Sequence, residues 1–233
     1  MDVLRRKTQE IQYDQEDTFQ SVLLAYSKHE VNDVSLREQA RHLIVIPIIH
    51  SETDLGSMSE SIRAIHVRRH GSHHWQHRVK TVEQLWQDLK ERIEDLRLDY
   101  SHVRLYQDGL PNCGREIDIV RDLANAGSIN HQILLSAIER GAALTGTEAP
   151  ELLLEEYELA KQVLAMLGSG RGGELVSRQQ LLGKQLLEKR DQYIAERIAR
   201  TLQPGETALL FLGMLHAVEK RLPPEIQVRR LAT

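Results

Sequence analysis

Two segments that are far apart in the sequence each run from a series of apolar residues into a histidine. The first, LIVIPIIH, ends at His50, and the second, LLFLGMLH, ends at His216. Pro47 and Gly213 stand three positions before the two histidines. Because proline cannot donate to a strand ladder and glycine weakens a strand interior, each can mark the point where strand pairing ends. The repeated pattern predicts two buried strands that each deliver an imidazole to the same region.

Two carboxylates hold similar positions on two further predicted strands. Asp108 stands near the end of the strand predicted at 103–109, and Glu148 ends the strand predicted at 142–148. Open parallel sheets bind their ligands outside the carboxyl ends of the strands. Two imidazoles and two carboxylates at that edge have the composition of a metal site or an acid–base site. The expected cofactor is a divalent metal ion such as Mn²⁺, Co²⁺ or Zn²⁺.

Each of these four residues also has a purely structural interpretation. A histidine at a strand end can bond a loop carbonyl, Asp108-Gly109 is an ordinary turn sequence, and Glu148 favours the start of a following helix. The recurrence of the whole eight-residue pattern favours a functional role for the two histidines.

Helical segments separate the predicted strands. We expect an N-terminal helical segment over 1–42, a helix-rich insertion over 56–98, and helices over 115–126, over 129–140, from Pro150, and over 174–202. The strands are expected at 43–49, 103–109, 142–148, 207–215 and in the closing IQVRRL. Nearly continuous apolar strands without a hairpin signal predict mostly parallel pairing. The expected fold is α/β: a single domain over 1–233 with a mostly parallel central sheet, helices on both faces and a helix-rich insertion after the first strand.

The insertion contains two contrasting stretches. After Thr81, six apolar residues share one helical face: Val82, Leu85, Trp86, Leu89, Ile93 and Leu96. Before it, HVRRHGSHHWQH (66–77) holds five histidines in twelve residues. Because Gly71-Ser72 should interrupt a helix there, the preferred interpretation is an exposed loop. The alternatives are a basic lid over the crevice that engages an anionic substrate, and a metal site built on His66, His70 and His74, which are four apart.

Composition restricts the class of protein. The 233-residue chain has a net charge of −4, which gives no broad electrostatic reason to bind nucleic acid or anionic lipid. No apolar run approaches the roughly 20 residues that cross a bilayer, and the N-terminal MDVLRRKTQEIQ lacks the apolar stretch of a secretory signal. We therefore expect a cytoplasmic protein with a small-molecule or peptide substrate, no nucleic-acid partner and no membrane partner. Homo-oligomers remain compatible with the sequence.

For two other stretches we prefer a structural interpretation to a functional one. Cys113, the single cysteine, excludes an internal disulfide framework. It stands shortly before a predicted helix, where a Cys–His nucleophilic site is conceivable, but a small buried residue is the preferred interpretation. GSGRGG (168–173) lacks the Gly-Lys-Ser/Thr ending of a phosphate loop, so it is predicted to be a linker.

The segment 189–218, KRDQYIAERIARTLQPGETALLFLGMLHAV, resembles the C-terminal core of the TraB/PrgY/GumN family. Relatives of that family include the TIKI metalloproteases, the ChaN-like haem-binding proteins and the erythromycin esterases. The family pattern is a strand with Gly-x-x-His, here Gly213 to His216, preceded by a helix that opens with Arg-Asn or Arg-Asp, here Arg190-Asp191. PIIH (47–50) is similar to a second Gly-x-x-His of the family, with proline in place of glycine. Asp108 and Glu148 are similar in placement to the family's acidic residues.

The resemblance and the strand-end pattern together imply a divalent-metal-assisted hydrolase. His50 and His216 would be metal ligands or general bases. Asp108 and Glu148 would complete the coordination or orient a water, and Arg190 would stabilise a developing oxyanion.

Two other classes remain open at this point. The crevice could instead bind haem or a peptide without catalysis; an axial histidine suits haem, although 4% aromatic residues provide few partners for a porphyrin face. Alternatively, the helical insertion could dock a partner in a regulatory or scaffold protein.

Overall fold

The computed structural model describes residues 40–49, 58–168 and 174–231. The described residues from Arg41 onward belong to one compact unit. The helical segment predicted for 1–42 thus lies outside the described residues up to residue 39. Its last two residues belong to the first strand, not to a helix.

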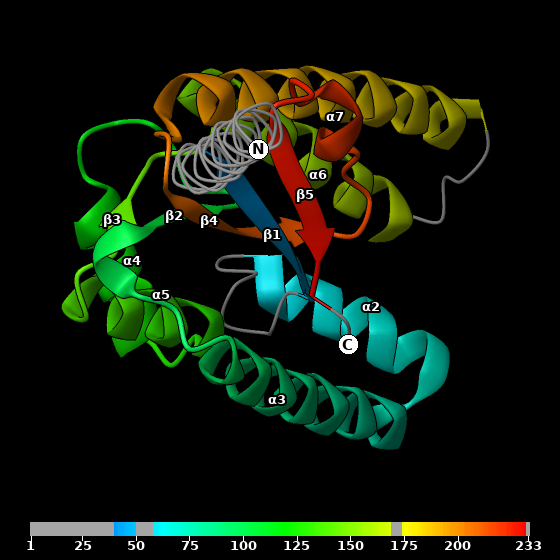
Figure 1. The fold of residues 1–233 in the computed structure, drawn as a ribbon. Helices are drawn as coiled ribbons and strands as arrows, with labels where there is room; N and C mark the ends of the chain where they lie inside the picture. Colours follow the sequence, from blue (N-terminus) through cyan, green and yellow to red (C-terminus); the bar gives the residue numbers. More distant parts are fainter. Residues whose placement is uncertain (1–39, 50–57, 169–173, 232–233) are drawn as a thin grey trace, which may run out of the picture. The chain divides into compact units, whose positions relative to one another are not determined.

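Five strands form one sheet in the order β3-β2-β4-β1-β5 (Figure 1). Their bounds are Arg41–Ile48 for β1, Val103–Gln107 for β2, Ala143–Leu144 for β3, Thr207–Gly213 for β4 and Ile226–Arg230 for β5. Each strand pairs in parallel with its neighbours. The parallel sheet of the predicted α/β fold is confirmed, and the carboxyl ends of all five strands lie at one edge.

Helices fill the connections between strands. Their bounds are Ser59–His70 for α2, Ser72–Asp95 for α3, Glu116–Asn125 for α4, Ile129–Glu139 for α5, Pro150–Gly168 for α6 and Glu174–Thr201 for α7, with short 3₁₀ helices at Tyr100–His102 and Val218–Arg221. None of the described helices is long and apolar enough to cross a membrane.

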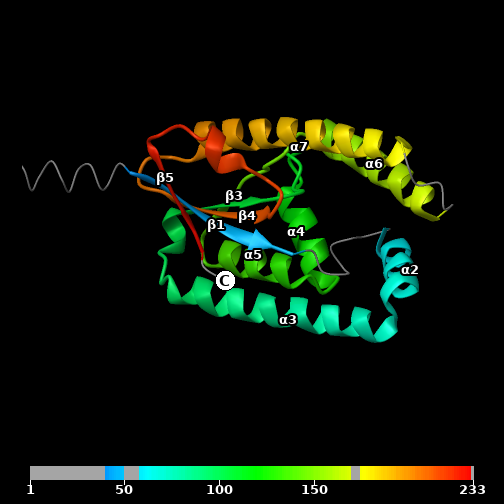
Figure 2. The ribbon, with the colours of Figure 1, turned by 90° about the vertical axis from the view of Figure 1, so that its right-hand side faces the viewer.

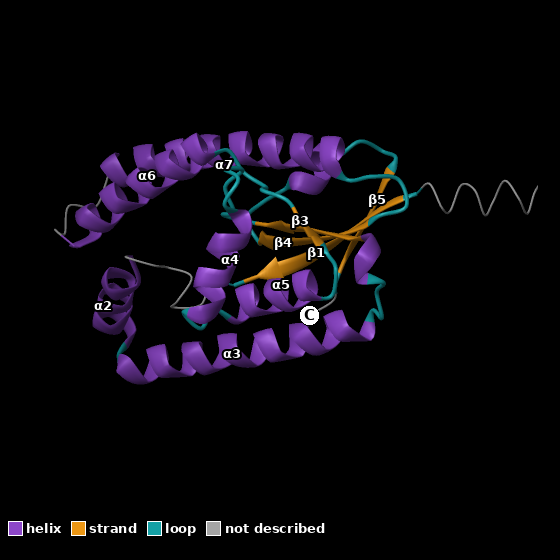
Figure 3. Ribbon diagram, turned by 90° about the vertical axis from the view of Figure 1, so that its left-hand side faces the viewer, coloured by secondary structure: helices purple, strands orange, loops and turns teal. Residues whose placement is uncertain are grey.

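The sheet separates two hydrophobic cores. Successive side chains of a strand point to opposite faces, so Ile44 and Ile46 pack on one side while Leu43 and Val45 pack on the other. The first core includes residues of α3, α4 and α5, and the second includes residues of α7. Figures 2 and 3 show the same layers, with α7 over one face and α3 and α5 under the other. Helices on both faces are therefore confirmed.

The apolar face predicted for the second half of the insertion is the one that α3 buries. Val82, Trp86, Leu89 and Ile93 are buried, and Leu85 and Leu96 pack partly buried against the same core. The Trp86 indole N–H also donates to the Ile49 carbonyl at 3.1 Å. The helix is thus part of the domain core on the face of the sheet that α4 and α5 also cover.

The stretch 66–77 is helical, so its interpretation as an exposed loop is wrong. The helix α2 continues to His70, and α3 begins at Ser72, with only Gly71 between them. Gly71 has φ +86°, in the left-handed region that glycine adopts at little cost. A single such residue turns the chain from one helix into the next without a loop.

Three predicted strands are shorter than expected, for local reasons. The strand β2 ends at Gln107, where a tight turn through Gly109 (φ +78°) begins. The strand β3 has two residues, because the hydroxyl of Thr147, and not a backbone carbonyl, accepts the Gln107 N–H at 2.9 Å. The strand β4 ends at Gly213, whose carbonyl accepts the N–H of His216 in a turn.

Pro47 lies where β1 loses one of its two neighbours. The last β1–β5 pair is Val45 with Arg230, and the Val45 carbonyl accepts from Leu231 N–H at 2.9 Å. Because alternate residues of a parallel strand bond to the same neighbour, Pro47 faces the side on which β5 has ended. Its missing N–H therefore costs no ladder bond, while pairing with β4 continues to Ile48 opposite Gly213.

Candidate active site

Asp108 follows β2 directly, and its side chain reaches the end of the neighbouring strand β4. The Asp108 N–H donates to the Phe211 carbonyl at 2.9 Å, and its Oδ2 accepts from the Gly213 N–H at 3.0 Å. The carboxylate is buried. It is therefore fixed between the carboxyl ends of two adjacent strands.

Gly213 leaves the space that this arrangement needs. A Cβ on Gly213 would lie 2.8 Å from Oδ2 of Asp108 and 3.6 Å from Cδ2 of His216. The first separation is closer than carbon and oxygen tolerate, so a side chain here would displace the carboxylate. The glycine of the LLFLGMLH pattern is thus needed by the candidate site as well as by the end of the strand.

Glu148 is held against the turn that follows Asp108. The Gly109 N–H donates to Oε1 of Glu148 at 2.7 Å, and the Glu148 N–H donates to the Leu110 carbonyl at 3.0 Å. The Glu148 carbonyl accepts from Asn112 N–H at 2.8 Å. Its carboxylate is almost completely buried. The loop after the short strand β3 therefore carries Glu148 to the same edge of the sheet as Asp108.

Arg190 on α7 joins these two carboxylates. Its Nε lies 2.5 Å from Oε2 of Glu148, and its Nη2 lies 2.7 Å from both Oε1 of Glu148 and Oδ1 of Asp108. Its Nη1 donates to Glu156 on α6. Planar guanidinium groups suit such two-point pairing with carboxylates. Every nitrogen of Arg190 therefore faces a carboxylate.

The next residue of α7, Asp191, holds the histidine. Its Oδ1 lies 2.6 Å from Nδ1 of His216, and its Oδ2 accepts from the Ala217 N–H at 2.9 Å. On the other side of the ring, Nε2 of His216 lies 3.4 Å from Oδ2 of Asp108. The imidazole of His216 is therefore flanked by a carboxylate at each nitrogen.

The charges of this cluster do not cancel. Asp108, Glu148 and Asp191 are buried carboxylates, and Arg190 is a buried cation beside two of them. Among these buried groups two negative charges are left over with neutral His216 (three minus one) and one with protonated His216. The partly exposed Glu156 beside Arg190 and Arg221, 3.9 Å from Oδ2 of Asp191, cancel each other. The site therefore favours additional positive charge.

The pKa shifts of His216, Asp108 and Glu148 agree with this excess of negative charge. Burial acts to lower the pKa of His216, but the hydrogen bond and charge of Asp108, with Asp191, raise it above its ordinary value. Burial acts to raise the pKa of Asp108, but His216 and Arg190 outweigh it and hold this pKa well below its usual range. Burial raises the pKa of Glu148 in spite of its pairing with Arg190. The imidazolium of His216 is thus a stabilised species in this site.

The predicted site residues are brought together as far as the structure describes them. His216, Asp108, Glu148 and Arg190 form one buried network. His50 lies outside the described residues. The described part of β1 ends beside β4, with Ile48 opposite Gly213.

Two members of the network were missing from the predicted site. Asp191 belongs to the Arg190-Asp191 pair of the family pattern, so its position carried a signal, although no role followed from it. No sequence signal pointed to Glu156, because its contact with Arg190 depends on how α6 packs beside α7. Its side chain is 49% exposed, which makes it the most accessible carboxylate of the network.

Cys113 does not have the buried position that we predicted. It is exposed in the turn before α4, where its backbone N–H donates to Glu116 at 2.8 Å. The prediction relied on the usual preference of free cysteine for the interior. Here the Pro111–Gly114 turn needs only the backbone of the residue, so the side chain points to solvent.

The alternative interpretation of 66–77 as a lid requires this stretch to lie at the edge of the sheet that carries the candidate site. Figures 2 and 3 show α2 beyond the carboxyl ends of the strands, and α2 contacts α6. Closure of this helix over the site stays a prediction.

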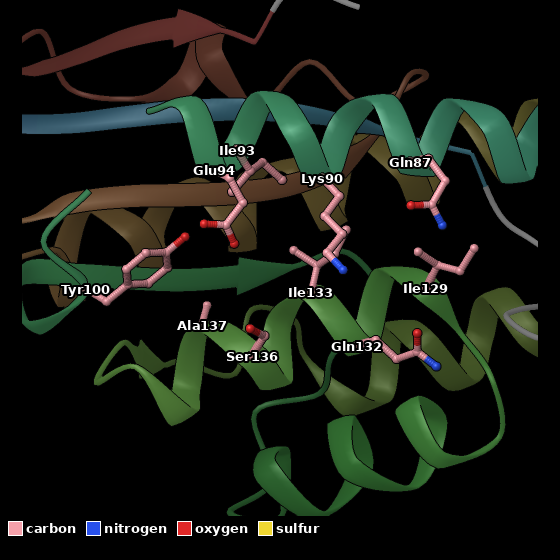
Figure 4. A pocket seen from close by; sticks show the side chains of 10 residues that line it. All are labelled: Gln87, Lys90, Ile93, Glu94, Tyr100, Ile129, Gln132, Ile133, Ser136 and Ala137. Atoms are coloured by element: carbon pink, nitrogen blue, oxygen red, sulfur yellow. The ribbon is translucent and has the colours of Figure 1, made fainter. Parts of the chain in front are cut away.

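A separate small hollow of about 80 Å³ lies between α3 and α5. Figure 4 shows Lys90 and Glu94 from α3 facing Gln132 and Ser136 from α5, with Tyr100 at one end. None of its lining residues belongs to the network around His216. Its size suits a few waters and not a substrate.

Comparison with known proteins identifies no relative. No family model, no curated protein and no solved structure matches this chain. The resemblance to the TraB/PrgY/GumN family therefore rests on the short motifs around Arg190 and His216.

Proposed function

We propose that this protein is a hydrolase that uses His216 as its acid–base residue at the carboxyl edge of the sheet. The observation that carries the proposal is the carboxylate at each nitrogen of one buried imidazole, 2.6 Å away at Nδ1 and 3.4 Å away at Nε2. A general base is more effective when its protonated form is stabilised, and two flanking carboxylates stabilise imidazolium.

Asp191 orients the base. When His216 is neutral, a proton on Nδ1 is shared with Asp191, which leaves the lone pair on Nε2 free to accept a proton. That lone pair then faces the Asp108 carboxylate 3.4 Å away, so a proton donor or a cation is favoured beside the two groups. A water molecule there would be oriented by both groups and could be activated for attack on an ester, amide or similar carbonyl.

Arg190 has a positioning role in this proposal. It holds Asp108 and Glu148 in place, and its remaining nitrogen donates to Glu156. An oxyanion that displaces the half-exposed Glu156 would gain the charge of Arg190. In this way the oxyanion role expected for Arg190 is retained without breaking its two buried contacts.

In the alternative form of this proposal, Nε2 of His216 and Asp108 would hold the expected divalent metal ion, and His216 would then be a ligand and not the base. Two ligands about 2.0–2.1 Å from one tetrahedral ion lie roughly 3.3 Å apart, close to the 3.4 Å between Nε2 and Oδ2. Asp191 is placed like the carboxylates that support metal-bound histidines. A bound ion would supply a water of lowered pKa and balance the two excess negative charges. The described residues contain no complete group of three ligands around this position, and His50 stays the predicted third ligand.

Hydrolysis of a panel of activated esters and fluorogenic peptides tests the proposal, with and without Mn²⁺ or Zn²⁺ after treatment with chelator. His216→Ala should lower kcat/KM by about 10²- to 10⁴-fold, the usual contribution of a general base. His102→Ala is the matched control, because the side chain of His102 is 69% exposed and its described partners lie outside the network. Equal rates for wild type and His216→Ala would refute the proposal. Absence of hydrolysis by the wild type would favour the ligand-binding alternative.

A further inference from the structure

Three histidines gather where α2 meets α3, in a place separate from the network around His216. The ring centroids of His66 and His70 lie 4.9 Å apart, those of His66 and His74 lie 5.1 Å apart, and those of His70 and His74 lie 5.4 Å apart. Nε2 of His66 is 3.0 Å from Nδ1 of His74. The three imidazoles therefore form a compact triangle, which we call the histidine trio.

The local sequence explains how the trio forms. His66 and His70 are four residues apart on α2, so they share a face of that helix. The turn at Gly71 then brings the first turn of α3, with His74, back against them. The ring of Trp75 lies edge-on to His66 with centroids 5.2 Å apart, and Trp75 itself is buried. His66 therefore packs against a buried aromatic ring.

Positively charged and titratable groups crowd around His66 in this corner. Partial removal from water, followed by His70, His74 and Arg78, lowers the pKa of His66 below its ordinary value. The sequence has no aspartate or glutamate between Glu60 and Glu83 that could stabilise imidazolium. Three protonated rings at these separations would repel one another. Neutral imidazole is the form that binds metal ions.

The dimensions suit one ion of the zinc type. Two nitrogens bound to the same tetrahedral ion lie about 3.3 Å apart, and the closest pair in the trio is already at 3.0 Å. The described residues hold no group of three ligands in a ready arrangement, since two trio nitrogens face each other and not a shared point. His70 and His74 are exposed, so their rings can turn without disturbing the core. The nearby charge of Arg78 opposes a cation and sets a limit on affinity.

We propose that His66, His70 and His74 together bind one divalent late transition-metal ion, Zn²⁺ or an ion of similar ligand preference. Three imidazoles leave one tetrahedral position for water or an external ligand. No residue of α2 is buried, so few contacts fix this helix. A bound ion would therefore hold α2 against α3. This site does not depend on the proposed hydrolase activity.

Calorimetric titration of the full-length protein with Zn²⁺ tests the site, in the His216→Ala background so that the two proposed metal sites do not overlap. Single changes of His66, His70 or His74 to alanine should each weaken Zn²⁺ binding by at least tenfold. His73→Ala and His77→Ala are the matched controls from the same stretch, and they should bind as the parent does. Co²⁺ in place of Zn²⁺ should give the visible absorption of a tetrahedral nitrogen site, and His70→Ala should abolish it.

Circular dichroism provides the check on folding: none of the five histidines is buried, so all five variants should retain the parent spectrum. The proposal is overturned if the parent binds no Zn²⁺. It is also overturned if the three trio variants bind as tightly as the parent, or if the control variants lose binding to the same extent.

Discussion

Asp191 and His216, which are 25 positions apart in the sequence, share a contact of 2.6 Å between Oδ1 and Nδ1. Both side chains are buried, and the same carboxylate also accepts the backbone N–H of Ala217. This pair joins α7 to the turn after β4. Because buried charged groups are costly unless they are paired, the contact fixes the direction of the imidazole and stabilises its protonated form.

Replacing Asp191 by asparagine tests that contact. Asp191→Asn should lower the free energy of unfolding by about 1.5–3 kcal/mol, the range for hydrogen bonds to buried charged groups, and should lower hydrolysis by at least tenfold. Urea denaturation and steady-state kinetics measure the two effects. Asp118→Asn is the control, because Asp118 is 53% exposed and should change neither. Wild-type stability and activity in Asp191→Asn would show that the contact is dispensable.

The raised pKa of His216 predicts how stability changes with pH in the metal-free protein. A group whose pKa is higher in the folded state stabilises the fold below its unfolded value, near 6.5, and this contribution is lost as pH rises through the folded pKa. The free energy of unfolding of the wild type, relative to that of His216→Gln, should therefore fall as pH rises above about 6.5. Denaturation at a series of pH values gives the difference. A constant difference between the two proteins would contradict the raised pKa.

Alanine substitutions at Leu210 and Leu215 test whether stability depends on the core packing of this segment. Leu210 is fully buried in β4 and Leu215 is 84% exposed. Leu210→Ala should destabilise by about 2–5 kcal/mol because a cavity replaces a core side chain, whereas Leu215→Ala should stay within about 0.5 kcal/mol of wild type. Chemical denaturation measures both, and metal affinity of the folded fraction should be unchanged in Leu210→Ala. Similar stability losses in the two variants would mean that the core assignment of β4 is wrong.

Gly213 offers a test of the space beside Asp108. In Gly213→Ala the new methyl group would meet Oδ2 of Asp108 at 2.8 Å, so the carboxylate must move and hydrolysis should fall by at least tenfold. Gly183→Ala in α7 is the control, because its Cβ meets only a leucine methyl at 3.7 Å. Alanine in that helix should stabilise by about 0.5–1 kcal/mol and leave hydrolysis unchanged. Full hydrolysis by Gly213→Ala would show that the close approach is not required.

The sequence predicts the parts of this structure that depend on local patterns. The apolar runs predict the parallel strands. The polar residues at or after the strand ends predict that Asp108, Glu148 and His216 lie at one edge of the sheet. The contact of Asp191 with His216 could not be found in this way, because it depends on how α7 packs over the sheet. Helix–helix packing likewise sets the contact of Glu156 with Arg190.

Two errors have a common physical cause. Residue preferences make Gly71 a helix breaker, but one glycine with positive φ is enough to join α2 to α3 directly. Composition therefore predicted a loop where the backbone builds a helical corner. The residue type of Cys113 predicts an interior position, although its turn uses only its backbone. In both cases the turn geometry, which residue preferences do not specify, decided the outcome.

The most direct test of the account compares the ionisation of His216 with hydrolysis on the same sample. The His216 ring proton signal, assigned by its loss in His216→Ala, gives the pKa by NMR, and kcat/KM for the best substrate of the panel is measured over the same pH range. We predict that kcat/KM rises with pH through an apparent pKa that equals the NMR value and lies above the ordinary 6.5. A rate that stays constant, or falls, while His216 loses its proton would contradict the proposed role of His216 as the base.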